Sequence, residues 1–95
     1  MAQNTTKTVA ASTWVQLTND DIAAATFQNN GSNAVFILAT PDATDPTSTS
    51  GAIRYNPGAG ERSTVTLAQL FPGVTTPVRL FAYAPQGGQV LISHA

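Results

Sequence analysis

The alternation of apolar and polar residues along the chain predicts a series of short β-strands. The longest unbroken apolar run covers residues 34–39, between turn-forming residues at 29–33 and 40–42. A short apolar run bounded by turn residues is typical of a strand, because a helix needs more length. Val35 points to one face of this strand and Phe36 to the other, and both faces are apolar. We therefore expect a central strand that is covered on both sides.

Shorter segments on either side of this run alternate in the same way. They predict strands within residues 5–11, 13–17, 22–28, 51–55, 61–66, 77–84 and 89–93, although residues 22–25 could instead form a short capped helix. The pair Asn30-Gly31 is a strong hairpin signal. The segment 41–50 contains two prolines and two aspartates, so we expect an exposed loop there.

One helical turn is predicted near Leu67-Phe71. Thr66 can cap its start, and Pro72-Gly73 ends it. With about seven to eight short strands and this one turn, the fold class is all-β, a small antiparallel β-sandwich or barrel. A chain of 95 residues makes a single domain.

We predict that residues 1–11 form an N-terminal arm or edge strand and that residues 12–95 form the single β domain. Val9 is the only substantial apolar side chain between Thr5 and Ala11. A strand with so little to bury gains little from its own core, whereas its backbone groups can pair with a neighbouring sheet edge. We therefore expect these residues to contact another subunit and not to pack on their own domain.

The composition narrows the function classes. Charged residues make up 9% of the chain, the net charge is −1, and the four basic residues are scattered, which argues against a nucleic-acid partner. Without cysteine, neither a disulfide nor a thiolate metal site is available, and oligomerisation is the usual remaining support for a small domain. No apolar run approaches the ~18 residues of a membrane span and no signal core precedes residue 8, so we expect synthesis in a cytoplasm, without export or a membrane partner.

Candidates for catalysis or metal binding are weak. His94 is the only histidine and lies one residue from the C-terminus, where a frayed or interface-packed side chain is the alternative to a catalytic one. Two acidic pairs could act in glycosidic chemistry or bind a hard cation, but a solvated turn accounts for both: Asp20 with Asp21, and Asp42 with Asp45. We predict no catalytic residue, no cofactor and no metal, so the protein is not expected to be an enzyme.

Aromatic and basic residues suggest contact surfaces instead. Three rings could form a sugar-stacking or base-stacking face, with packing in the core or an interface as the alternative: Trp14, Tyr55 and Tyr83. Arg54 and Arg79 each lie in mid-strand among apolar neighbours, so each should reach an acid or a neighbouring subunit. The interface residues that we predict are Thr5, Thr6, Lys7, Thr8, Val9, Trp14, Arg54 and Arg79.

Four segments, residues 13–18, 51–62, 70–73 and 78–84, together resemble small virion proteins of tailed bacteriophages, most similar to the capsid decoration (cement) proteins. The resemblance implies a non-enzymatic protein, often a homotrimer, that binds the outside of the major capsid protein shell and stabilises it. It also implies a location on the capsid exterior of the virion. Two alternatives remain open: a carbohydrate- or receptor-binding virion module, and a head–tail or tail structural component.

Overall fold

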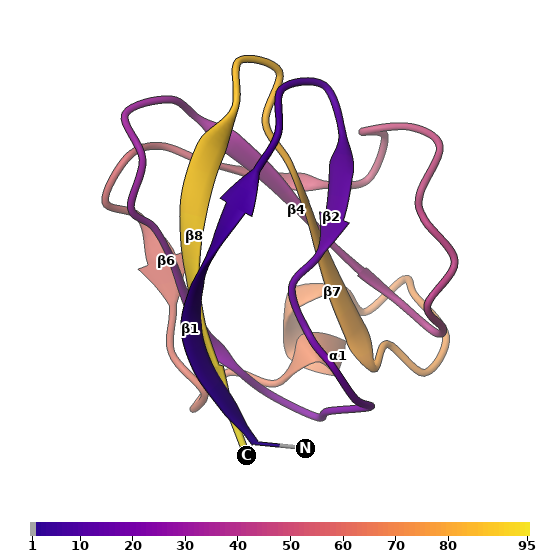
Figure 1. The fold of residues 1–95 in the computed structure, drawn as a ribbon. Helices are drawn as coiled ribbons and strands as arrows, with labels where there is room; N and C mark the ends of the chain where they lie inside the picture. Colours follow the sequence, from indigo (N-terminus) through magenta and orange to yellow (C-terminus); the bar gives the residue numbers. More distant parts are fainter. Residues whose placement is uncertain (1) are drawn as a thin grey trace.

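The computed structural model describes residues 2–95 and contains two four-stranded antiparallel sheets packed face to face (Figure 1). The first sheet has the order β1-β8-β3-β6, and the second has the order β2-β7-β4-β5. In chain order the elements are β1 (Gln3–Val9), β2 (Trp14–Gln16), β3 (Thr26–Asn29), β4 (Val35–Thr40), β5 (Ile53–Tyr55), β6 (Gly60–Glu61), α1 (Leu67–Leu70), β7 (Arg79–Tyr83) and β8 (Gly88–His94). The prediction of a small all-β sandwich with one helical turn is confirmed.

The strand order is that of an eight-stranded jelly roll. The chain crosses from one sheet to the other at each of its first three connections, and β7 and β8 then insert beside the earlier strands, one in each sheet. This arrangement consists of two interleaved Greek keys, and the strands within residues 2–95 pair antiparallel throughout. The long-range pairing of β1 with β8 places the beginning and the end of the chain side by side (Figure 1).

The core lies between the two sheets and is filled by alternate residues of each strand. In β4, Val35, Ile37 and Ala39 are buried, whereas Phe36 and Leu38 are only half-buried. The expectation that β4 would be covered on both faces is therefore wrong. The strand is interior in its sheet, with β7 on one side and β5 on the other, but a two-layer sandwich covers each sheet on one face only.

The N-terminal segment is an edge strand of the domain's own first sheet. All seven residues of β1 pair with β8, Val9 is buried in the core, and the Gln3 Nε2 atom donates to the Leu17 carbonyl oxygen at 2.6 Å. The expectation that residues up to Ala11 would not pack on their own domain is wrong, because β8 satisfies the backbone groups of β1 and Val9 is buried. Contact of these residues with another subunit stays a prediction. Lys7 lies on the core side of this edge strand, and an inward-facing lysine discourages pairing with a further strand.

The helical turn α1 forms where it was predicted. The Gln69 backbone N–H donates to Thr66 Oγ1 at 3.1 Å, and the Thr66 N–H donates to Gln69 Oε1 at 2.8 Å, which makes a capping box. Leu67 and Phe71 bury their side chains in the core, so this turn closes one end of the sandwich. Among residues 2–95, no helix has the length and apolar character needed to span a membrane.

Other local predictions meet different outcomes. Residues 41–50 are exposed apart from the half-buried Pro46, as expected for a loop. The expected strand at 22–28 begins only at Thr26, and its helical alternative does not form. The expected strand at 61–66 is reduced to the two residues of β6. Ile22 and Ala25 are buried in the core although they lie outside a strand, whereas none of residues 62–66 is buried.

Asn29, at the end of β3, connects the two sheets through a fully satisfied buried side chain. It is 1% exposed, and its Nδ2 atom donates to the carbonyl oxygens of Asn33 at 2.8 Å and Tyr55 at 3.0 Å. Its Oδ1 atom accepts from the Gly31 N–H at 3.0 Å. One amide therefore holds the β3–β4 turn and the end of β5 in place.

We predict that Asn29→Ala lowers the free energy of unfolding by about 2–4 kcal/mol, because buried backbone groups lose their partners. Chemical denaturation followed by circular dichroism measures this loss. Asn30→Ala is the matched control, since the exposed Asn30 side chain makes no hydrogen bond within residues 2–95, and it should change stability by less than about 0.5 kcal/mol. Equal stability of the two variants would contradict the role given to Asn29.

Candidate interaction face

The outer face of the second sheet carries a row of three aromatic rings and one arginine. Strand pairing places Trp14 opposite Tyr83, Tyr83 opposite Phe36, and Phe36 opposite Arg54. These four residues, called here the aromatic row, cross all four strands of the sheet. The three rings are half-buried and Arg54 is exposed. A set of rings on this side of the sheet contacts water, because the core lies on the other side.

The rings of the aromatic row support one another. The centroids of the Trp14 and Tyr83 rings are 5.2 Å apart, and the ring planes are tilted by 42°. Cross-strand aromatic pairs of this kind stabilise a sheet by a few tenths of a kcal/mol to ~1 kcal/mol. The tilt means that the two rings present an uneven apolar surface and not one flat platform.

A second row packs beside the first and makes this face a dense layer. Phe81 lies between Gln16 and Leu38 on the same outer face, yet it is 0% exposed. The Gln16 Nε2 atom donates to the Thr18 carbonyl oxygen at 2.5 Å, which holds the Gln16 side chain in place. Neighbouring side chains therefore cover Phe81 completely, although it lies on the outer face of the sheet.

The two arginines on this face have different surroundings. Arg79 Nε donates to Asp21 Oδ1 at 2.8 Å, with the two side chains 20% and 67% exposed. This ion pair is open to solvent and stabilises the fold by at most ~1 kcal/mol. Within residues 2–95, Arg54 has no hydrogen-bond or ion-pair partner. Of the two predicted mid-strand charges, Arg79 reaches an acid of its own chain, whereas Arg54 pairs with no group among the described residues.

Arg54 borders a hollow of about 440 Å³ at the end of the aromatic row. The other walls include Asn33 from the β3–β4 turn, Phe36 from β4, and Pro85 and Gln86 from the β7–β8 turn. The Asn33 Nδ2 atom donates to the Gly87 carbonyl oxygen at 3.4 Å, so one turn holds the other. The hollow therefore combines a cation, two amide side chains and apolar walls.

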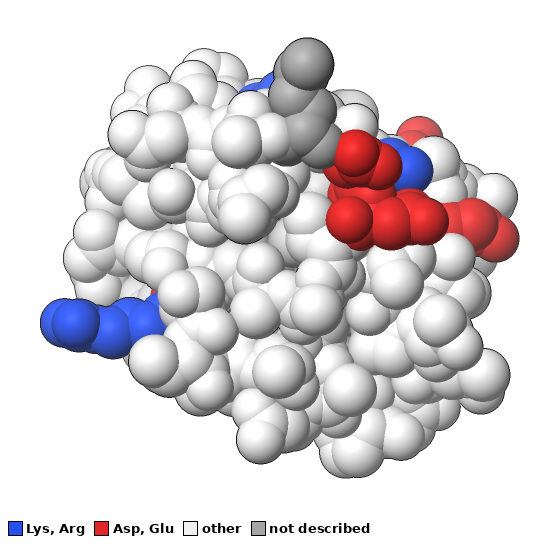
Figure 2. Space-filling view, turned by 90° about the horizontal axis from the view of Figure 1, so that it is seen from below, with Lys and Arg blue, Asp and Glu red and all other residues white. Residues whose placement is uncertain are grey.

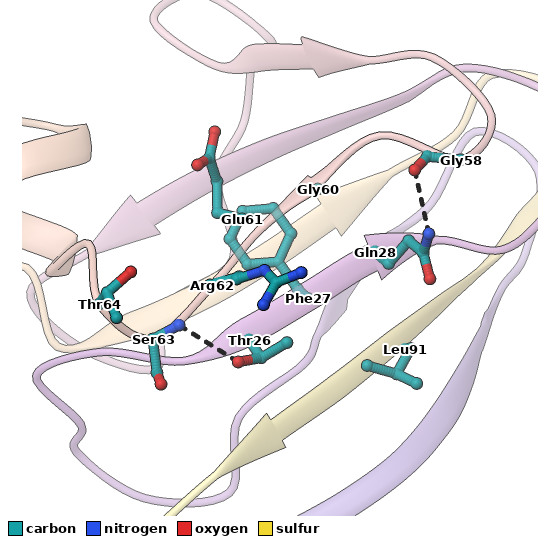
Figure 3. A pocket seen from close by; sticks show the side chains of 10 residues that line it. All are labelled: Thr26, Phe27, Gln28, Gly58, Gly60, Glu61, Arg62, Ser63, Thr64 and Leu91. Atoms are coloured by element: carbon teal, nitrogen blue, oxygen red, sulfur yellow. Dashed lines mark hydrogen bonds between the residues drawn. The ribbon is translucent and has the colours of Figure 1, made fainter.

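A second hollow lies on the opposite side of the sandwich, on the outer face of the first sheet (Figure 3). It has a volume of about 540 Å³ and is lined by polar groups of Thr26, Gln28, Ser63 and Arg62. The Ser63 N–H donates to Thr26 Oγ1 at 3.2 Å, and Gln28 Nε2 donates to the Gly58 carbonyl oxygen at 3.0 Å. Leu91 and Phe27 also line this hollow, but Phe27 is buried in the core, so the hollow has no exposed ring like those of the aromatic row.

The structure brings together three of the eight residues predicted at an interface. Trp14, Arg54 and Arg79 share the outer face of the second sheet, whereas the other five belong to β1 in the first sheet: Thr5, Thr6, Lys7, Thr8 and Val9. Phe36 was missed as a surface residue because its apolar neighbours in sequence suggested burial on both faces. The signal that identifies it is the pairing register, which appears only in the folded sheet.

Tyr55 belongs to the core and not to a ring platform. Its ring meets Phe27 edge to face, with centroids 5.2 Å apart, and its hydroxyl donates to Glu61 Oε2 at 3.2 Å. Burial raises the pKa of the Tyr55 phenol above its ordinary value, and the adjacent Glu61 carboxylate raises this pKa further. Of the three rings proposed for stacking, Trp14 and Tyr83 remain accessible.

The candidates for catalysis do not assemble into a bonded set. His94 is buried, and its ring nitrogens lie 3.4 Å from Gln3 Nε2 and 3.0 Å from the Ala95 carbonyl oxygen. It shares the border of a hollow with Asp21, but no hydrogen bond joins the two within residues 2–95. Asp42 accepts from the Thr44 N–H at 2.9 Å, as a solvated turn does.

Charged side chains are sparse over the surface seen from below: acidic groups and a basic one lie together at the upper right, a basic group projects at the left, and most of the surface is uncharged (Figure 2). In the part of the chain that the structure describes, no group of three His, Asp or Glu side chains is placed to hold a metal ion.

No protein-family model, curated protein or solved structure matches the chain.

We predict that the protein loses stability as pH rises above about 10, the ordinary pKa of tyrosine. The folded state keeps the Tyr55 proton to higher pH than the unfolded state does, so the folded state binds more protons in that range and its stability falls. Tyr55→Phe should cost ~1 kcal/mol at neutral pH, through the lost hydrogen bond, and should flatten the alkaline fall. Urea denaturation at a series of pH values measures both effects.

The control for this measurement is Tyr83→Phe on the outer face, which retains Tyr55 and should keep the alkaline fall of the wild type. The assignment to Tyr55 is wrong if Tyr55→Phe and the wild type lose stability with the same slope above pH ~10.

Proposed function

We propose that the protein is a non-enzymatic capsid decoration protein that binds the outside of a major capsid protein shell through the aromatic row. The observation that carries the proposal is an ordered apolar face, with Trp14, Tyr83 and Phe36 in contact with water beside an unpaired Arg54. Tyr, Trp, Phe and Arg are the residues enriched at protein interfaces, and Trp, Tyr and Arg dominate their binding energy.

Composition and topology support the same proposal. Only 9% of the residues are charged, so most of the surface can be covered by neighbours without burying charge. The jelly-roll order of strands occurs in viral capsid domains and in lectins. Fold alone does not determine function, so the topology supports a capsid protein and a lectin equally. The resemblance to decoration proteins favours the capsid protein.

The proposed assembly is a homotrimer on the capsid exterior of a phage virion. Association gives a 95-residue domain without cysteine the additional buried area that small scaffolds otherwise obtain from disulfides or metals. A head–tail or tail component would use the same type of face, and it differs in the part of the particle to which the protein binds.

The competing function is a carbohydrate- or receptor-binding virion module. It is favoured by the accessible rings of Trp14 and Tyr83 beside the polar side chain of Gln16. It is weakened by the tilt of 42° between those two rings, because a sugar stacks on an open, flat ring surface. Burial of Tyr55 removes the third ring from such a platform.

We predict that the wild-type protein co-sediments with purified phage shells that lack it and that Trp14→Ala weakens this binding by at least about tenfold, as loss of an aromatic anchor does. Gln28→Ala, on the outer face of the first sheet, is the control and should bind like the wild type. Circular dichroism and thermal melting establish that each variant is folded. Binding to tails alone, or no binding to any shell, would reject the proposal, and ring-dependent binding to a glycan array without shell binding would favour the competing function.

A further inference from the structure

Arg54 is an exposed cation beside a hollow that has apolar and amide walls. It lies in mid-strand in β5, opposite Phe36, and it faces the 440 Å³ hollow between two turns. No group within residues 2–95 neutralises it or accepts its hydrogen bonds. Its guanidinium therefore offers up to five N–H donors in a planar fork to whatever occupies the hollow.

The walls of the hollow are held in position before a ligand arrives. Asn33 is fixed at two points, because its carbonyl oxygen accepts from Asn29 Nδ2 at 2.8 Å and its side chain bonds to the Gly87 carbonyl at 3.4 Å. Phe36 is fixed by its position in the interior strand β4. A site whose walls are already ordered loses less conformational entropy on binding.

We propose that this hollow binds a carboxylate and that its occupant is an aspartate or glutamate side chain on the surface of the shell protein. A carboxylate matches the guanidinium fork with two parallel hydrogen bonds. The adjoining rings point to a protein partner, because they would cover the ion pair and exclude water from it. The identity of the partner rests on the proposed function, whereas the carboxylate site itself does not.

The chain contains a matched control for this proposal. Arg62 is also exposed and also unpaired within residues 2–95, and it borders the hollow on the opposite sheet (Figure 3). Arg54 and Arg62 therefore carry equal charge and are both exposed, and they differ in the rings and fixed turns around them. If only Arg54 responds to a ligand or a substitution, the hollow around it is responsible. If Arg54 and Arg62 respond equally, their positive charge alone is responsible.

The first experiment tests the carboxylate site without any shell. Isotope-labelled protein is titrated with succinate, and with succinamide as its uncharged counterpart, while the Nε–H signals of Arg54 and Arg62 are followed by NMR. We expect succinate to shift the Arg54 signal saturably together with the backbone signals of Asn33 and Gln86, and succinamide to leave them unchanged. Equal responses at Arg54 and Arg62, or no response at Arg54, would overturn the site.

The second experiment tests the partner, by co-sedimentation of variants with phage shells. Arg54→Gln should weaken binding by about tenfold or more, Arg54→Lys should restore part of it, and Arg62→Gln should bind like the wild type. Raising the salt concentration from about 50 to about 500 mM should weaken the wild type more than Arg54→Gln, because the variant lacks the screened ion pair. Binding and salt dependence of Arg54→Gln equal to those of the wild type would overturn the partner assignment.

Together the two experiments distinguish failure of the carboxylate site from failure of the proposed partner. A saturable response of Arg54 to succinate without shell binding by the wild type would keep the carboxylate site and reject both the shell partner and the decoration function. Tighter binding of a uronic acid or of inorganic phosphate than of an acidic peptide would reject a protein side chain as the occupant. Shell binding that is lost in Trp14→Ala but unchanged in Arg54→Gln would keep the decoration function and reject this inference.

Discussion

The buried amide of Asn29 is the constraint on which the arrangement of both sheets depends. Asn29 belongs to β3 in the first sheet, yet its side chain bonds to the Tyr55 carbonyl of β5 and to the Asn33 carbonyl before β4, in the second. A buried amide left without these partners would cost several kcal/mol, so the two sheets keep one relative position at this end. The same bonds fix the turn that forms one wall of the hollow beside Arg54.

The sandwich has two chemically different outer faces. The first sheet presents hydroxyl and amide side chains, among them Thr6, Thr8 and Gln28, whereas the second presents the aromatic row. Hydroxyl and amide groups are well solvated in an isolated domain, but exposed rings gain free energy when a partner covers them. This difference is why the proposed docking surface lies on the second sheet.

The edge strands of both sheets are poorly suited to pairing with a further strand. β2 and β5, at the edges of the second sheet, have three residues each, and β6 has two. The longer edge strand β1 carries the inward-facing Lys7. Short edges and an inward charge both disfavour the addition of a further strand. Association through side chains of the outer face is therefore favoured over extension of a sheet.

Local pattern in the sequence was sufficient for the all-β class, the capped turn at Leu67 and the exposed loop at 41–50, because short-range sterics and hydrogen bonding decide those features. It also led to the prediction that Trp14, Arg54 and Arg79 are interface residues. Only the tertiary structure decided that β1 pairs with β8, that Phe36 faces outward, and that Trp14, Tyr83, Phe36 and Arg54 form one row. The physical reason is that register joins residues far apart in the chain, and alternation in one strand does not reveal which strand lies beside it or which face a second sheet will cover.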